Sequence, residues 1–223
     1  MSVDLSQHEN LILNIVQEYL SLNKFFDMKK VLPFIQSVLR SALVDLNTRA
    51  IEEILRSLVK KRLIVEGTKL TKNDILVNET RNKIYNYILK NPGSYFNKIV
   101  IDLNINKPVV VWHVKMLERF GYIKREVFEN HAIFFDTSLT DKKKKVGYFT
   151  SNEKSKRIIE YLKLNDFGIT KTNLSNDLGM HHNTVSKYLK KLEEFNVIIK
   201  KKTPKQTLYF LNEELLETMH LKL

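Results

Sequence analysis

The second half of the chain repeats itself at an offset of 75 residues, and this repeat constrains the fold more than any other feature of the sequence. The two copies match without a gap at a series of apolar positions: Ile99 with Leu174, Leu103 with Leu178, Val110 with Val185, Val114 with Leu189, Phe120 with Phe195 and Ile123 with Ile198. Upstream, Tyr87 matches Tyr161 at an offset of 74, which one residue inserted in a loop explains. This many matches in register indicate a true internal repeat, so we expect both copies to fold alike.

Each copy has the pattern of three helices followed by two strands. Apolar residues at helical spacing predict helices over residues 80–90, 94–103 and 107–120 in the first copy, and over 153–164, 171–178 and 182–195 in the second. Pro108 suits the first turn of its helix, while Gly121 and Asn196 stand where a helix ends in a left-handed residue. Strands are expected over 122–128 with 132–136, and over 197–202 with 207–211. Three helices and a hairpin, with a tight turn before the third helix, make a winged helix-turn-helix domain.

A fainter third copy precedes the repeat. Helices are expected over residues 8–22, 30–43 and 48–62, and Asn47 or Thr48 can cap the last of them. The apolar run 63–65 and then Gly67 follow that helix, as a first wing strand would. The N-terminal part is therefore predicted to be winged-helix-like.

The expected fold class is mainly α with small β-hairpin wings, an α+β arrangement of tandem winged helix-turn-helix domains. The expected domains are an N-terminal winged-helix-like domain (1–77), a middle winged helix-turn-helix domain (78–139), a basic linker (140–150) and a C-terminal winged helix-turn-helix domain (151–223). The linker carries the basic block Lys142-Lys143-Lys144-Lys145 and shows no apolar period. An amphipathic terminal helix is expected within 212–223, where it can dock on its own domain or form a dimer interface.

The composition favours a basic, soluble, cysteine-free protein. The formal net charge of +12 favours polyanionic partners such as nucleic acid or an anionic membrane surface. Because the chain has no Cys, a disulfide framework and a thiolate metal site are both excluded. The first ten residues lack the pattern of a signal peptide, and no apolar run approaches the roughly 20 residues that span a bilayer. We therefore expect a cytoplasmic protein with no membrane partner.

The stretches 112–123 and 184–195, each a third helix running into a strand, resemble the recognition helix and first wing strand of ArsR- and MarR-type winged helix regulators. The segment from Val65-Glu66-Gly67 through residues 76–81 to Asn91-Pro92-Gly93 resembles archaeal multi-winged-helix regulators. The resemblance implies a sequence-specific transcription regulator. Metal-sensing relatives use Cys and His ligands, so the lack of Cys puts metal sensing in doubt. The Lys-, Asn- and Ile-rich composition is typical of an AT-rich genome such as a methanogen's, and an activator of archaellum genes is one candidate within the family.

The third helix of the C-terminal copy is the expected DNA reader. Val185, Leu189 and Leu192 are spaced to face the core. The residues left on the outer face or first turn are His181, His182, Asn183, Thr184, Ser186, Lys187 and Lys190. Such side chains can read base edges or grip phosphates, although an ordinary solvated helix would carry them too. The wing adds Lys200, Lys201, Lys202 and Lys205, and residues 154–205 hold 12 Lys or Arg against 5 Asp or Glu. A basic helix beside a basic hairpin is suited to the phosphate backbone.

The middle copy is a weaker candidate reader. Its corresponding contacts would be Asn106, Lys107 and Lys115. However, Val109, Val111 and Trp112 also fall on the outward face, where they could pack on thymine methyls, on another domain or on a second chain. Trp112 is interpreted as a packing anchor rather than a base-stacking residue. The neighbouring His113 is interpreted as a hydrogen-bonded structural histidine.

Motifs of catalysis are missing from the sequence. It contains no phosphate-binding loop, no dinucleotide-binding glycine motif and no H-E-x-x-H. His181 and His182 are adjacent, so their imidazoles cannot readily face one metal from one helix. We therefore predict no catalytic residues, no metal and no cofactor. The expected partner is double-stranded DNA, with a homodimer, a monomer spanning one site, and contact with the transcription machinery all left open. The rival hypothesis is a tandem winged-helix subunit that binds proteins without reading DNA sequence.

Overall fold

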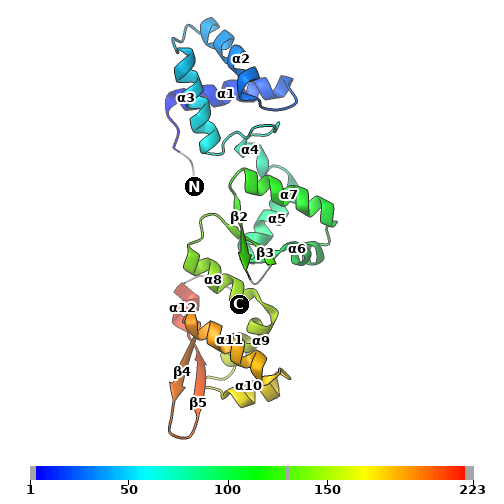
Figure 1. The fold of residues 1–223 in the computed structure, drawn as a ribbon, viewed down its shortest axis with the longest axis vertical. Coiled ribbons are helices and arrows are strands. Elements are labelled where there is room, and N and C mark those ends of the chain that lie inside the picture. The colour runs from blue at the N-terminus through cyan, green and yellow to red at the C-terminus, as the bar shows by residue number, and fades with distance from the viewer. Residues whose placement is uncertain (1–3, 129–130, 219–223) are drawn as a thin grey trace. The chain divides into compact units, whose positions relative to one another are not determined.

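The computed structural model describes residues 4–128 and 131–218 (Figure 1). The chain divides into two compact units, one of residues 1–86 with 105–123 and one of residues 87–104 with 124–223. Helices dominate, and the sheets are small and antiparallel, as a winged-helix fold class requires. The four expected domain ranges remain predictions.

Three helices open the first unit: α1 (Gln7–Leu22), α2 (Met28–Ser41) and α3 (Thr48–Lys60). Each buries an apolar stripe in one shared core, which includes Ile12, Val16, Ile35, Leu55 and Leu58. The predicted cap of the third helix is confirmed, because the Asn47 side chain accepts a hydrogen bond from the Ala50 N–H. The described helices match the predicted ones to within two residues at each end.

An ion pair ties α1 to α3. Glu9 lies in the first turn of α1, where its carboxylate accepts the Ser6 N–H and completes a capping box. Lys61 places its ammonium 2.7 Å from Glu9 Oε1, and Ser57 donates its hydroxyl to the same oxygen at 2.6 Å. These bonds, the one from Lys61 first, lower the pKa of Glu9 to about 2. The charged form of Glu9 therefore stabilises the packing of the first helix on the third.

The expected first wing is reduced to a single bridge. Among the described residues that follow α3, Ile64 pairs with Thr71 in an isolated antiparallel bridge, before the short helix α4 (Lys72–Ile75). The turn between Ile64 and Thr71 forms hydrogen bonds with the loop before α2. Phe26 donates its N–H to the Thr68 carbonyl, and the Phe26 carbonyl accepts the Gly67 N–H. Backbone groups that would have paired in a hairpin are thus satisfied by the loop before α2.

The first copy of the repeat contains α5 (Glu79–Lys90), α6 (Phe96–Leu103), α7 (Lys107–Arg119), β2 (Ile123–Phe128) and β3 (His131–Asp136). The predicted helix over 94–103 is wrong at its start, since Ser94–Tyr95 forms strand β1. Ser94 pairs with Phe134 and Tyr95 with Ile133, so the sheet order is β1-β3-β2. Pairing with a distant strand satisfies the backbone of these two residues, and α6 begins only after them.

The second copy lies wholly in the second unit and comprises α9 (Glu153–Lys163), α10 (Lys171–Asp177), α11 (His182–Glu194), β4 (Ile198–Lys202) and β5 (Thr207–Leu211). Its core gathers Ile158, Leu174, Val185, Leu192 and Tyr209. The arrangement is three helices followed by an antiparallel hairpin. The terminal helix α12 (Glu213–Thr218) follows, and residues 219–223 of the expected helix lie outside the described residues.

The segment expected to be a basic linker without an apolar period forms helix α8 (Asp141–Ser151), so the expectation of no regular pattern there is wrong, while its role between domains remains a prediction. Thr140 caps the helix, and Val146 and Phe149, spaced i and i+3, are buried in the core of the second copy. Lys144 is also buried, with its ammonium 2.7 Å from Glu126 Oε1, and this hydrogen bond raises the pKa of Lys144. The run of lysines obscured the helical spacing of Val146 and Phe149, the two side chains that attach α8 to this core.

The two copies share local geometry as well as sequence pattern. In each copy, the tyrosine of the first helix donates its hydroxyl to an aspartate of the second, and an asparagine caps the tyrosine carbonyl. Left-handed residues also recur at matching positions. The equivalent sets are Tyr87, Asp102 and Asn91 with Tyr161, Asp177 and Asn165, and Gly93, Asn104 and Gly121 with Gly168, Gly179 and Asn196. The predicted left-handed ends at Gly121 and Asn196 are confirmed.

Candidate nucleic-acid interface

Helix α11 has one buried face and one open face. Val185, Leu189 and Leu192 are buried, as predicted. The open face carries the predicted reading residues: His181, His182, Asn183, Ser186, Lys187 and Lys190 are exposed, and Thr184 is half-buried. The helix therefore holds a continuous polar surface clear of the core of its own domain.

His181 caps the N-terminus of α11. Its Nδ1 accepts the Asn183 N–H at 3.3 Å, which satisfies one of the free donors of the first turn. Because Nδ1 accepts this bond, the other ring nitrogen, Nε2, carries the proton of the neutral imidazole. The exposed ring thus offers a single N–H donor beside the first turn of the helix.

The hairpin divides the predicted wing lysines between its two faces. Lys200 pairs with Tyr209 and Lys202 with Thr207, so these two lysines share the face on which Tyr209 is buried. Lys201 lies on the opposite face, with its ammonium 4.8 Å from the ring centre of Phe210. Lys205 is exposed in the turn between the strands. Lys200 and Lys202 therefore lie on the same face of the hairpin as Tyr209, and Lys201 lies on the other face.

A groove of about 600 Å³ runs between α11 and the wing. Ser186, Lys190 and Glu193 line it from α11, and Lys200 and Tyr209 line it from the hairpin. Glu193 Oε2 lies 3.6 Å from Lys200 Nζ. Glu193 was not among the predicted contacts, although its spacing of i, i+4, i+7 with Ser186 and Lys190 places all three residues on one helix face.

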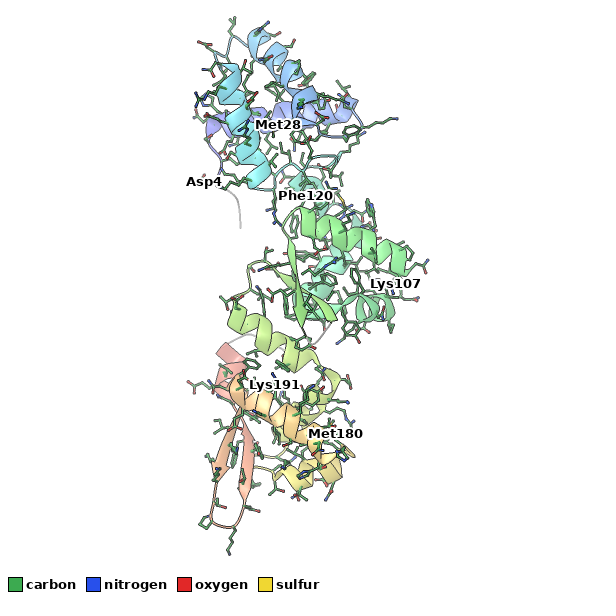
Figure 2. The ribbon with its side chains drawn as sticks, viewed as in Figure 1. Asp4, Met28, Lys107, Phe120, Met180 and Lys191 are labelled. Atoms are coloured by element: carbon green, nitrogen blue, oxygen red, sulfur yellow. The ribbon has the colours of Figure 1, made fainter. Side chains whose placement is uncertain are left out.

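Helix α7 presents a different surface from that of α11. Asn106 precedes the helix, Lys107 begins it (Figure 2), and both are exposed, as is Lys115. Val109, Val111 and Trp112 are also exposed, by 40%, 40% and 51%. The predicted contacts of the middle copy are therefore interrupted by apolar side chains.

Trp112 packs against Arg81 and His113 even though half of its surface is open. The Arg81 guanidinium lies 5.2 Å from the Trp112 ring centre, and the His113 ring meets the indole edge-on at 4.8 Å. His113 is buried, and burial, followed by the charge of Arg81, lowers its pKa. The predicted hydrogen bond of His113 is not found at Nδ1, which has no partner among the described residues.

The C-terminal end of α7 is held by the segment that follows α3. Arg62 donates to the Glu118 carbonyl at 3.0 Å, and Arg119 donates in turn to the Glu66 carbonyl. Tyr122 donates its hydroxyl to the Lys72 carbonyl at 2.9 Å. These three bonds join the C-terminal end of α7 to the segment that follows α3, and both belong to the first unit.

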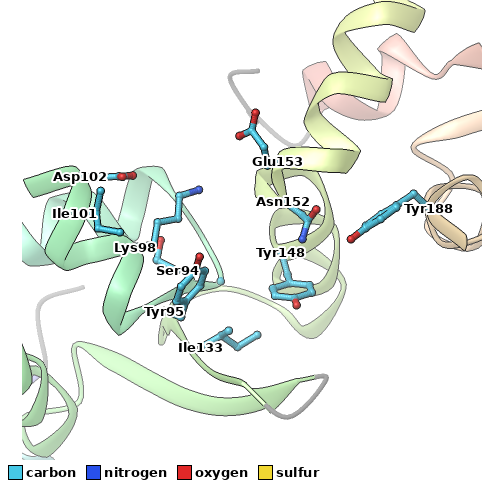
Figure 3. Close-up of a pocket in the computed structure, with 11 residues that line it drawn as sticks. Ser94, Tyr95, Lys98, Ile101, Asp102, Ile133, Tyr148, Asn152, Glu153 and Tyr188 are labelled. Carbon is cyan, nitrogen blue, oxygen red and sulfur yellow. The ribbon is translucent and has the colours of Figure 1, made fainter. Parts of the chain in front are cut away.

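A cavity of about 550 Å³ lies in the second unit, lined from α6, β3, α8, α9 and α11 (Figure 3). Tyr148, Asn152 and Tyr188 line it, the last of them from α11. Lys98 lines the cavity together with the carboxylates of Asp102 and Glu153, so charges of both signs border it.

Over residues 4–128 and 131–218, no group of three or more His, Asp or Glu side chains is placed to hold a metal ion. None of the described helices has the length and apolar character needed to cross a membrane.

The chain is similar in sequence to a transcriptional regulator. No protein-family model matches the chain. The chain is 33% identical, over 161 residues, to an uncharacterized HTH-type transcriptional regulator of Methanocaldococcus jannaschii. The match supports a helix-turn-helix regulator family. It covers 71% of this chain but 40% of the relative, so the chain matches less than half the length of that protein.

Proposed function

We propose that the protein is a sequence-specific transcription regulator that binds double-stranded DNA. Helix α11 enters the major groove, and the β4–β5 wing follows the phosphate backbone. The observation that carries this proposal is the polar open face of α11, which stands beside a groove lined by Lys190 and Lys200. A helix of this kind reads base edges with its N-terminal half, while lysines position it on phosphates.

The residues of α11 have distinct roles in this proposal. The Asn183 amide is suited to the paired donor and acceptor of adenine, and the Thr184 methyl group to that of thymine. Lys187 reaches guanine acceptors or phosphate, and the His181 Nε2–H donates to an acceptor at the groove edge. The remaining contacts to DNA come from His182, Ser186, Lys190, Lys200, Lys201, Lys202 and Lys205.

The finer parts of the proposal concern assembly. The middle copy acts as a second winged helix of ArsR type and adds contacts through Asn106, Lys107 and Lys115. The protein acts by binding rather than by catalysis, and it does so in the cytoplasm. It binds DNA either as a homodimer or as a monomer that spans one site with two domains. It also contacts the transcription machinery. The archaellum genes of a methanogen are one candidate target. The helix-turn-helix relative supports DNA binding as the core of this proposal.

Selection of bound genomic fragments, followed by sequencing, tests the proposal. We expect one motif to be enriched at moderate salt. In Asn183→Ala/Lys187→Ala, affinity for that motif should fall by about 1–3 kcal/mol, or roughly 5- to 150-fold, because base contacts are lost. Lys156→Ala on α9 is the matched control, since it removes an exposed charge that already pairs with Glu160. Absence of any enriched motif, even at low salt, would refute the proposal.

A second function, protein binding by α7, is favoured by the exposure of Val109, Val111 and Trp112. Exposed apolar residues that cluster on one helix mark interaction surfaces more often than phosphate contacts. Trp112→Ser should then leave DNA selection intact and change the sedimentation coefficient or the retention of a transcription-machinery partner. If Trp112→Ser weakens DNA binding instead, α7 is a second reader.

A further inference from the structure

The groove between α11 and the wing contains a carboxylate among its lysines. Glu193 lies on the groove side of α11, where its Oε2 is 3.6 Å from the Lys200 ammonium. The side chains of Glu193 and Lys200 are 41% and 31% exposed, so solvent and a ligand can reach both. Lys190 and Ser186 complete the helix side of the groove.

We propose that Glu193 limits the affinity of the protein for DNA by competing with phosphate for the Lys200 ammonium and so weakening the contact of Lys200 with the DNA backbone. This inference rests on the proposed DNA-binding function. Glu193 is then a specificity residue: it weakens contacts that any duplex could make through its backbone and leaves base reading by the first turns of α11 unaffected.

The geometry of the hairpin explains why the Glu193 carboxylate can compete with phosphate for Lys200. Lys200 is paired with Tyr209 across the hairpin, so its side chain leaves β4 on the face where Tyr209 is buried and reaches α11. A phosphate that enters the groove competes with Glu193 for the Lys200 ammonium and is repelled by the carboxylate. Both effects oppose binding whatever the base sequence, because every phosphate carries the same charge.

The neighbouring Glu194 provides a matched comparison. It also borders the groove and carries the same charge, but it is exposed and, within the described residues, makes no ion pair with Lys200. Glu194→Gln therefore removes the same charge from the same helix without releasing Lys200.

The test measures how DNA affinity depends on salt. Full-length wild type, Glu193→Gln, Glu194→Gln, Lys200→Met and Glu193→Gln/Lys200→Met are titrated against a labelled 20-base-pair duplex of random sequence by fluorescence polarisation, from 50 to 200 mM NaCl. Circular dichroism verifies that each variant is folded. Release of one lysine to one phosphate adds about 0.9 to the slope of log affinity against log salt.

We expect Glu193→Gln to bind more tightly than wild type, with an advantage that shrinks about 3.5-fold between 50 and 200 mM salt. Glu194→Gln should keep the wild-type slope. In the Lys200→Met background, Glu193→Gln should no longer steepen the slope, because the lysine that it releases is gone.

Two results overturn the inference while leaving DNA binding in place. One is a wild-type slope in Glu193→Gln, and the other is a steeper slope that persists when Lys200 is Met. A wild-type protein that binds neither random duplexes nor selected genomic fragments at 50 mM salt would instead overturn the proposed function.

Discussion

Phe149→Ala tests whether α8 belongs to the C-terminal core. The Phe149 side chain is 1% exposed and stacks on Phe195 at a centroid distance of 5.2 Å and an interplanar angle of 24°. The Lys191 ammonium lies 5.5 Å from the Phe149 ring centre. Removing a buried phenylalanine costs about 3–5 kcal/mol, because the transfer free energy is lost and a cavity remains. The free energy of unfolding of a domain is about 5–15 kcal/mol, so the loss is a large part of it.

The assay is hydrogen exchange followed by mass spectrometry, because peptides from α9 and α11 report on the second unit alone. We expect the opening free energy of these peptides to fall by about 3–5 kcal/mol in Phe149→Ala. Phe167→Ala is the matched control: Phe167 is 94% exposed, so its loss should change the opening free energy by less than about 0.5 kcal/mol. A fall below about 1 kcal/mol in Phe149→Ala would show that α8 is not part of this core.

Three further predictions follow from contacts in the two units. Glu9→Gln should make the free energy of unfolding of the first unit less dependent on pH in acid. In the wild type, charged Glu9 contributes about 1–3 kcal/mol above its unfolded pKa of about 4.5, and this contribution is lost as the pH falls through about 2. Urea titrations from pH 7 to 2 measure the difference, and identical pH profiles of wild type and variant would contradict the prediction. Gly168→Ala should destabilise the second unit by about 2–4 kcal/mol in thermal or urea unfolding, since φ is +78° and the new Cβ would lie 2.4 Å from a ring carbon of Phe210. Gly179→Ala, with φ of +58° and open space around the Cβ, should cost only about 1 kcal/mol, and equal losses in both would refute the steric argument. Lys202→Ala should reduce the slope of log DNA affinity against log salt by about 0.9, and an unchanged slope would remove Lys202 from the backbone contacts.

The sequence was most informative where local chemistry decides the structure. Helical spacing placed Val185, Leu189 and Leu192 in the core and left the polar face of α11 open. The caps and ends of helices followed from single residues, such as Asn47 and Gly121, because their hydrogen bonds or backbone angles are set within one turn.

The remaining features depend on partners far away in the chain. Ser94–Tyr95 became a strand because β3 supplies its hydrogen bonds, and nothing within the segment itself records that pairing. Helix α8 was missed because a run of lysines masked Val146, and burial of Lys144 against Glu126 requires a strand that precedes it. The helical period places Glu193 on the groove side of α11, so this residue could have been predicted from the sequence. Its partner Lys200 could not, because the face of β4 on which Lys200 lies depends on the register of the hairpin.

The hydrogen bonds that recur in the two copies have a consequence for how the chain can change. The tyrosine–aspartate bond and the left-handed turns lie inside each copy, whereas most outward positions of α7 and α11, apart from Lys115 and Lys190, carry different side chains. The residues that form these recurring bonds and turns, here called the frame, are therefore different from the outward residues of α7 and α11, here called the surface. Exchange of surface residues between the copies requires no change to the frame, so a duplicated module of this kind can acquire a new ligand while keeping its old stability.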